Sequence, residues 1–228
     1  MIDPKEERRS RRPRNSAGFL RGGKSLVTRG ARRRDVIPDV HVTWKENLLS
    51  EKTDDKPVYE INANVWHHAT RRRIGYFQAY MLFPTEQGLD PDELYYLCDY
   101  HDQTLAEFGE QLYGATPKRL EQLLRGGELL FVHLVELLAE WHGRGIGAAV
   151  FRAILEEMRD TFGASIAILE PVPFQFDSPF PREAADTEML RAYETAVASI
   201  RRYYTNSFDA KPLRRGGSYY YVRIPNSV

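Results

Sequence analysis

The stretch that decides the fold is LLFVHLVELLAEWHGRGIG, residues 129–147. Its first part, Leu129 to Leu138, is an almost unbroken apolar run, which is typical of a strand covered on both faces. Glycines at 143, 145 and 147 follow at once. After them, one helical face is formed by Ala149, Phe151, Ile154, Leu155 and Met158. The stretch therefore predicts a central strand, a glycine turn and a helix.

A second buried strand follows this helix. It lies in ASIAILEPVPF, which starts at residue 164 and contains Pro171 and Pro173, residues that end a strand. Strand, helix and strand in succession form a βαβ unit. We predict an α/β (α+β) fold with a mixed sheet and helices on both of its faces.

The rest of the body adds strands and helices around this unit. We expect a first strand at Val36 to Trp44 and a helix from about Arg182 to Tyr204. VYEINANVWHH and RIGYFQAYMLF predict an antiparallel hairpin around HATRR. Further predictions are one or two helical segments from Asp90 to Gly114, a short helix in TPKRLEQLLRGG and a closing strand in GGSYYYVRIP.

Length and composition suit one domain with some extra chain. The sequence has 228 residues, 42% of them hydrophobic, and we divide it into a basic tail at 1–35 and a single domain at 36–228. The single cysteine, Cys98, excludes an internal disulfide and fits a reducing compartment, so we expect a cytoplasmic protein. The longest apolar run carries His133 and Glu136 and is shorter than the roughly 20 residues that span a bilayer, so no membrane segment is expected.

The net charge of zero hides an asymmetry. Residues 1–34 hold 12 Lys or Arg against 3 Asp or Glu, or +9, so residues 35–228 hold 20 against 29, or −9. One interpretation is a solvated arm that lies on the acidic body. The other is a nucleic-acid-binding arm, although Phe19 is its only aromatic residue and no series of stacking platforms is present.

GFLRGGKS, from Gly18 to Ser25, matches the phosphate-loop pattern G-x-x-x-x-G-K-[ST]. Such a loop needs a buried strand before it and a helix after it. The flanks EERRSRRPRNSA and LVTRGARRRD carry neither pattern. We therefore reject a nucleoside triphosphate site here.

HGRGIG, from His142 to Gly147, has the flanks that the first motif lacks. Its glycines allow close approach of the backbone, and successive N–H groups from Arg144 to Ala148 can point at one anionic group. The structural alternative is a turn needed only for tight strand-to-helix packing. Glycines alone do not decide between the two.

The motif and its flanks, from about Leu129 to Ile224, resemble the GCN5-related N-acetyltransferase (GNAT) superfamily. That family carries [QR]-x-x-G-x-[GA] between a central strand and a helix. Gly145 and Gly147 match this pattern, and His142 departs from it. LEPVPFQ, residues 169–175, is similar to a P-x-P-x-Q-like segment of a little-characterised bacterial branch.

The resemblance implies an acyl-CoA N-acyltransferase fold with a mostly antiparallel sheet, and acetyl-CoA as acyl donor. Pantetheine would enter a gap between strands, against backbone groups of Leu137 and Ala139, and the pyrophosphate would lie on residues 144–148. The implied acetyl-CoA-binding residues are Leu137, Ala139, His142, Gly143, Arg144, Gly145, Ile146, Gly147 and Ala148.

The resemblance also implies catalytic candidates. YYTNSF aligns Tyr203 with a family tyrosine that protonates the departing thiolate, although Tyr203 or Tyr204 could equally cap the core. A phenol suits this role because its pKa lies close to that of a thiol. The base that deprotonates the amine is His133, Glu136 if a bulge turns it inward, the weaker candidate Glu170, or water.

The sequence predicts an enzyme that passes an acetyl group from acetyl-CoA directly to an amine acceptor in a ternary complex, without a metal. No His, Cys or carboxylate spacing indicates zinc, and Cys98 has no base beside it in sequence. The alternative is a non-catalytic CoA-binding or sensor protein of the same fold, whose basic tail engages nucleic acid or an acidic partner. Acceptor, acyl length and oligomeric state stay open.

Overall fold

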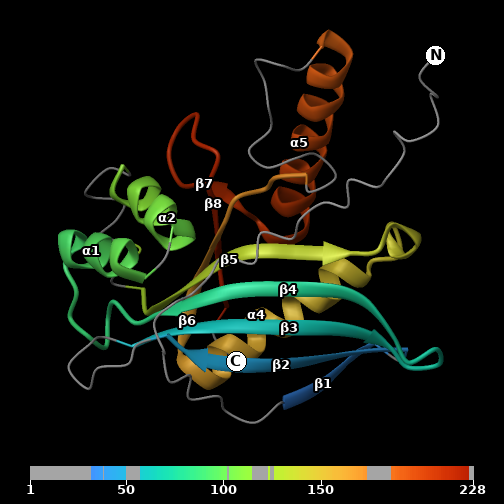
Figure 1. Ribbon diagram of the computed structural model, residues 1–228, viewed down its shortest axis with the longest axis horizontal. Helices are drawn as coiled ribbons and strands as arrows, with labels where there is room; N and C mark the ends of the chain where they lie inside the picture. Colours follow the sequence, from blue (N-terminus) through green and yellow to red (C-terminus); the bar gives the residue numbers. More distant parts are fainter. Residues whose placement is uncertain are drawn as a thin grey trace, which may run out of the picture.

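The computed structural model describes residues 32–37, 39–49, 57–101, 103–114, 123, 126–173 and 186–225, with 32, 33 and 35 described by their backbone alone. Its centre is an eight-stranded sheet with the strand order β1-β2-β3-β4-β5-β6-β8-β7 (Figure 1). The strands are β1 (Arg32–Ile37), β2 (Val40–Leu48), β3 (Val58–His67), β4 (Arg72–Leu82), β5 (Glu128–Leu137), β6 (Ala164–Leu169), β7 (Lys211–Pro212) and β8 (Tyr220–Arg223).

One pair of neighbouring strands is parallel, β5 with β6, and the helix between them crosses over one face of the sheet. The other pairs are antiparallel. This confirms the predicted fold class: a mixed, mostly antiparallel sheet flanked by helices. The predicted hairpin is also confirmed, since β3 and β4 pair along their length around a turn at His68 to Arg71.

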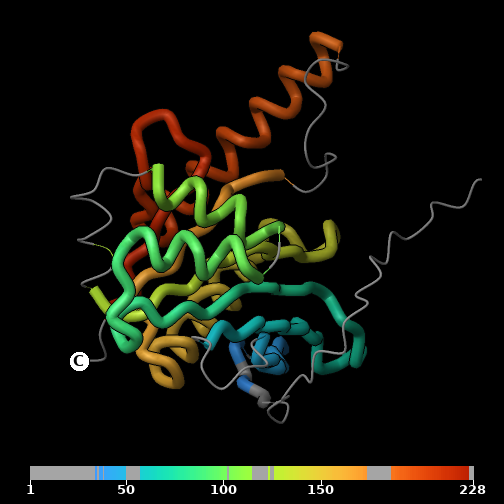
Figure 2. Tube along the Cα trace, turned by 60° about the vertical axis from the view of Figure 1, so that its left-hand side comes forward, coloured from blue at the N-terminus to red at the C-terminus, as the bar shows by residue number. Residues whose placement is uncertain are grey.

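Helices cover the two faces of the sheet. α1 (Pro91–His101) and α2 (Gln103–Tyr113) lie on one face, and α4 (Ile146–Phe162) lies on the other. Alternating residues of β4 account for this arrangement, because Phe77 and Ala79 pack in the same core as α4, whereas Tyr80 and Leu82 pack in the core of α1 and α2. α5 (Thr187–Phe208) projects from the body at its N-terminal end (Figure 2).

α1 starts where the sequence predicts it. The Asp90 carboxylate accepts a hydrogen bond from the Glu93 N–H at 2.8 Å, and the Glu93 carboxylate accepts one from the Asp90 N–H at 3.1 Å. This reciprocal capping box satisfies two N–H groups at the helix start. Within the described residues, none of the helices combines the length and apolar character needed to cross a bilayer.

The predicted first strand, Val36 to Trp44, is wrong in its extent. Two strands occupy this region, and the chain reverses between Ile37 and Val40, whose Cα atoms are partners. In the sequence, apolar and polar residues alternate moderately through both strands. This alternation hid the turn signal of Pro38 and Asp39.

The predicted end of the last helix, Tyr204, is also wrong. α5 continues to Phe208 and ends at Asp209, which has a left-handed φ of 51°. The last turn is held by packing, because the Phe208 ring lies edge-on against Phe151 at 4.8 Å between centroids. This contact outweighs the weak helix preference of Thr, Asn and Ser. The helix begins at Thr187, and the Asp186 side chain caps it.

Several predictions fall on residues that are not described. They are the tail at 1–31 with its GFLRGGKS match, most of the short helix in TPKRLEQLLRGG, the last two residues of LEPVPFQ and the start of the last helix at about Arg182. Of the predicted tail, residues from Arg32 onward form β1. Arg34 ties this strand to α4, with Nη2 2.6 Å from the Glu156 carboxylate and Nη1 donating to the Ala153 carbonyl at 3.2 Å.

Candidate active site

The sheet splits between β5 and β6. Their parallel pairing ends at Val132 and Leu169, whereas β5 continues to Leu137 and pairs there with β4 only. Glu170 and Pro171 follow β6, and proline cannot donate a ladder hydrogen bond. The edge of β5 over residues 133–137 that faces β6 is therefore not paired to that strand.

A cavity of about 800 Å³ opens at this split. It is lined by the second half of β5, the turn that follows, the first turn of α4, the end of β6 and one face of α5. The strand, the glycine turn and the helix that the sequence motif predicts all contribute to this lining. The sequence motif and the split therefore form a single site.

The turn after β5 depends on backbone conformations that favour glycine. A short 3-10 helix, Ala139–Trp141, is followed by Gly143 and Gly145 with φ values of 71° and 74°. Gly145 is the N-cap of α4, and no side chain caps the first turn of this helix. The N–H groups of an uncapped helix start favour an anionic group, and residues 145 to 148 line the cavity.

Gly147 is closely surrounded by side chains, and its φ is not in the left-handed region. A Cβ atom at this position would lie 3.3 Å from the Tyr203 hydroxyl and 3.4 Å from the Leu137 Cδ1 atom. The end of β5, the start of α4 and the last turns of α5 therefore meet here. Added Cβ atoms at Gly143 and Gly145 would meet nothing within 4 Å.

His142 closes the turn onto the strand. Its Nε2 atom lies 2.8 Å from the Leu137 carbonyl oxygen, and as the donor in this bond Nε2 carries the proton. Leu137, one of the two residues expected to meet pantetheine, thus has a side-chain partner for its carbonyl. Ala139 is exposed and lines the cavity.

Arg144 is not among the residues that line the cavity. Its guanidinium carbon is 5.0 Å from the centroid of the ring of Trp141, a cation–π contact with a residue that does line it. The backbone of the neighbouring glycines, and not this side chain, faces the cavity.

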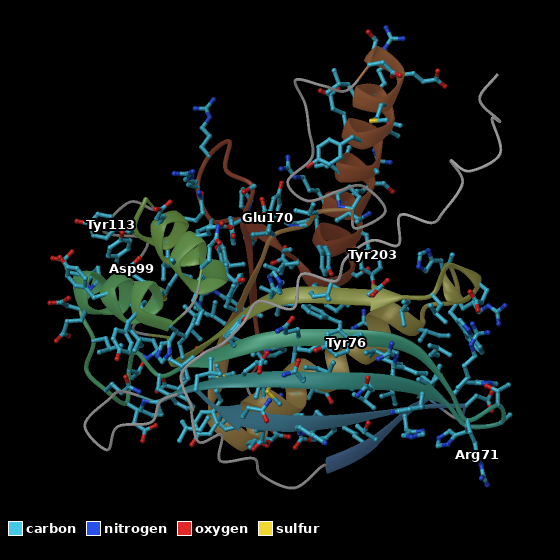
Figure 3. The ribbon with its side chains drawn as sticks, viewed as in Figure 1. Arg71, Tyr76, Asp99, Tyr113, Glu170 and Tyr203 are labelled. Carbon is cyan, nitrogen blue, oxygen red and sulfur yellow. The ribbon has the colours of Figure 1, made fainter. Side chains whose placement is uncertain are left out.

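Tyr203 brings a phenol into the cavity from α5 (Figure 3). The side chain is 39% exposed, and burial raises the pKa of its hydroxyl, with a partly opposing effect of Arg152. The neighbouring Tyr204 packs its ring on Phe151 and Phe208, and burial raises its pKa further. Tyr204 therefore packs in the core, and Tyr203 is the more accessible of the two phenols.

A β-bulge places His133 and Glu136 in the same cavity. Gln78 pairs with Leu134 and Ala79 with Val132, so His133 is the extra residue on β5. The expectation that this half of β5 is covered on both faces is wrong, because both His133 and Glu136 are exposed and line the cavity. Val135 and Leu137, beyond the bulge, pack toward α4.

Glu170 also lines the cavity, at the end of β6. His133, Glu136, Glu170 and Tyr203, which are distant in sequence, therefore share one space. Among the described residues, no group of three or more His, Cys, Asp or Glu is placed to hold a metal ion. Cys98 belongs to α1 and is buried in the core that this helix covers.

A polar patch beside the cavity was not predicted from the sequence. Tyr76 is the cross-strand partner of Glu136, and its hydroxyl donates to the Asn62 side chain. Burial, then the charge of Glu60, raises the pKa of Tyr76, and Glu60 accepts from Gln78 at 2.8 Å. The alternation of Glu60, Asn62 and Asn64 along β3 was the available signal.

Gly75 holds β4 against the end of β5. An added Cβ would lie 2.5 Å from both the Glu136 carbonyl oxygen and the Leu137 Cδ2 atom, so the strand would have to move. We expect Gly75→Ala to lower the free energy of unfolding by about 2 kcal/mol, as overpacking does. Urea titration followed by circular dichroism measures this.

Gly217→Ala is the matched control for Gly75→Ala, since the three atoms nearest to its added Cβ all belong to the exposed Arg214 side chain and none to the backbone. We expect it to change the free energy of unfolding by less than about 0.5 kcal/mol. Equal effects of the two substitutions would contradict the close packing at Gly75.

Among the described strands, the mostly antiparallel order, the one parallel pair with its crossover helix and the split at the glycine turn agree with the layout that the resemblance noted in the sequence implies. No protein-family model matches the chain, and no curated protein matches it. Among solved structures, it is similar to mosquito arylalkylamine N-acetyltransferase like 5b, with 14% identity and a TM-score of 0.35. That similarity covers 50% of this chain and 52% of the mosquito chain.

Proposed function

We propose that this protein is an acetyl-CoA-dependent N-acyltransferase in which an amine acceptor attacks the thioester directly in a ternary complex. One observation carries the proposal. The uncapped start of α4, the edge of β5 beyond its pairing with β6 and the Tyr203 side chain open into one cavity. An anion site, an extended slot and a proton donor are the three features that a CoA thioester needs.

In this proposal the N–H groups from Arg144 to Ala148 hold the pyrophosphate, with Gly143 and Gly145 setting the turn. Pantetheine lies in the split, against Leu137 and Ala139. The His142 bond to the Leu137 carbonyl fixes the direction of that carbonyl. The protein acts mainly by positioning, since alignment of amine and thioester lowers the entropic part of the barrier.

The chemical step forms a C–N bond and breaks the C–S bond. The amine nitrogen attacks the thioester carbonyl carbon, and a strand amide near Leu137 stabilises the developing oxyanion, an effect of about 3 kcal/mol per donor. The Leu138 N–H is already bonded to the Ile74 carbonyl at 2.8 Å and does not serve. Tyr203 donates a proton to the departing thiolate, and its raised pKa keeps that proton in place at neutral pH.

His133, Glu136 and Glu170 are the candidates for the base that takes the proton of the amine, and water is the fourth. Single replacements by Gln separate them. The base is the residue whose replacement removes the acidic limb from the pH profile of kcat/KM. If all three variants keep that limb, water is the acceptor of the proton.

Release of free thiol from acetyl-CoA across a panel of amines tests the proposal. We expect turnover with at least one primary amine and a mass increase of one acetyl group on that amine. CoA binding without turnover, together with salt-sensitive retention of DNA, would instead support the non-catalytic alternative with its basic tail.

A further inference from the structure

The turn that follows β5 has few contacts of its own to hold it in one conformation. Its 3-10 helix, Ala139–Trp141, is three residues long, and two backbone hydrogen bonds of 2.9 and 3.1 Å close it. Gly143 and Gly145 follow, and glycine loses more conformational freedom on folding than any other residue. A binding site built on this turn therefore needs contacts from other elements to keep its N–H groups in place.

The end of the β3–β4 hairpin supplies one such contact. His67 is the last residue of β3, and the centroid of its ring lies 4.6 Å from that of Trp141, with the two planes 48° apart. Pairs of aromatic rings at this separation attract each other beyond the effect of area burial. The Nδ1 atom of His67 also lies 2.9 Å from the Thr70 hydroxyl oxygen, within the hairpin turn. In Figure 3, Arg71 marks this turn.

The other strand of the hairpin holds the neighbouring residue of the turn. Arg72 begins β4, and its Nη1 atom lies 3.2 Å from the Glu140 carboxylate. Both side chains are more than half exposed, so this ion pair contributes little by itself. The Leu138 N–H, just before the 3-10 helix, donates to the Ile74 carbonyl of β4 at 2.8 Å. The hairpin therefore contacts the turn at three nearby positions.

Trp141 connects the hairpin to the cavity. Its side chain is half-buried and belongs to the lining, whereas His67 and Arg72 are not among the lining residues. The same ring carries the guanidinium of Arg144, the residue just before the N-cap of α4. The ring therefore links the end of β3 to the part of the turn that leads into the helix.

We infer that His67 is a positioning residue of the diphosphate site, and that it acts through Trp141 to keep the glycine turn in its binding conformation. As a statement about CoA, the inference rests on the proposed function. Without the ring contact, the turn occupies other conformations as well. The apparent affinity for the diphosphate then falls in proportion to the fraction of molecules that keep the binding conformation.

His67→Ala tests the inference by calorimetric titration of the full-length protein. We expect the Kd for acetyl-CoA to rise about three- to tenfold, the range that corresponds to one aromatic contact. The Kd for free pantetheine, which lacks the diphosphate, should change less than about twofold. His67→Phe keeps an aromatic ring at this position and should restore the Kd for acetyl-CoA. Equal loss of affinity for both compounds would overturn the inference.

His68→Ala is the matched control. It removes the same type of side chain from the next position, where the ring also has a contact at 4.6 Å, but with His41 of β2. We expect this variant to bind acetyl-CoA like the unmodified protein. If the His67 and His68 variants weaken binding equally, the end of the hairpin serves the fold as a whole and the inference is wrong.

Hydrogen exchange without any ligand separates this inference from the proposed function. His67→Ala should speed amide exchange over residues 139–148, and His68→Ala should not. If the unmodified protein does not bind acetyl-CoA but the turn still responds to His67→Ala, the diphosphate site fails and the positioning contact stands. Unchanged exchange together with unchanged acetyl-CoA binding in the His67→Ala variant would overturn the inference and leave the proposed function intact.

Discussion

Replacing Ala148 by Asp is expected to weaken acetyl-CoA binding about 100-fold, or about 2.7 kcal/mol. Ala148 lies in the first turn of α4 and lines the cavity. A carboxylate there repels the diphosphate and competes with it for the same N–H groups, and like charges in contact cost several kcal/mol. Calorimetric titration with acetyl-CoA measures the change.

The fold should tolerate this carboxylate. An acidic side chain near a helix start interacts favourably with the helix dipole, by about 0.3–1 kcal/mol, so the free energy of unfolding should stay level or rise. Ala148→Asn is the matched control, because it has the same shape without the charge. If the Asp and Asn variants bind acetyl-CoA equally well, no phosphate lies at the start of α4.

Tyr203→Phe is expected to lower kcat about 100-fold while the Kd for acetyl-CoA changes less than about twofold, because general acid catalysis typically contributes at least that factor. The ring still fills its place beside Gly147, and only the hydroxyl that donates the proton is lost. Steady-state rates and calorimetry on the same preparation separate the two effects.

The pH profile gives a second test of Tyr203. Burial raises the pKa of this phenol above its ordinary value near 10, so the protonated form persists to higher pH and the alkaline limb of kcat should fall above pH 10. The limb should be absent from the Phe variant. A Phe variant with full kcat would show that Tyr203 belongs to the core alone.

Local patterns were sufficient for much of the fold. The apolar run from Leu129, the helical spacing after Gly147 and the second apolar strand predicted β5, α4 and β6 because strand and helix periods are local properties. Asp90 predicted the start of α1 through its capping chemistry. The sequence did not predict the turn between Ile37 and Val40 or the end of α5 at Phe208. At these two places turn chemistry and tertiary packing outweighed the periodicity.

The sequence predicted individual residues of the candidate site, but not how they are arranged in space. The glycine turn could be located from its flanks, but the bulge at His133 follows from pairing with β4, which no local pattern encodes. That bulge decides that His133 and Glu136 share the cavity. Three further contacts also depend on positions in space. They are the bond from His142 to Leu137, the contact of Arg144 with Trp141 and the cross-strand pairing of Tyr76 with Glu136.

The most direct test of this account is a calorimetric titration of the unmodified full-length protein with acetyl-CoA. We expect saturable binding of one molecule per chain, with a Kd in the range typical of enzyme substrates, about 1 μM to 1 mM. The same titration with free pantetheine, which lacks the diphosphate, should show at least about tenfold weaker binding. Absence of heat with acetyl-CoA, or equal affinity for both compounds, would contradict the claim that the start of α4 holds the diphosphate at the split between β5 and β6.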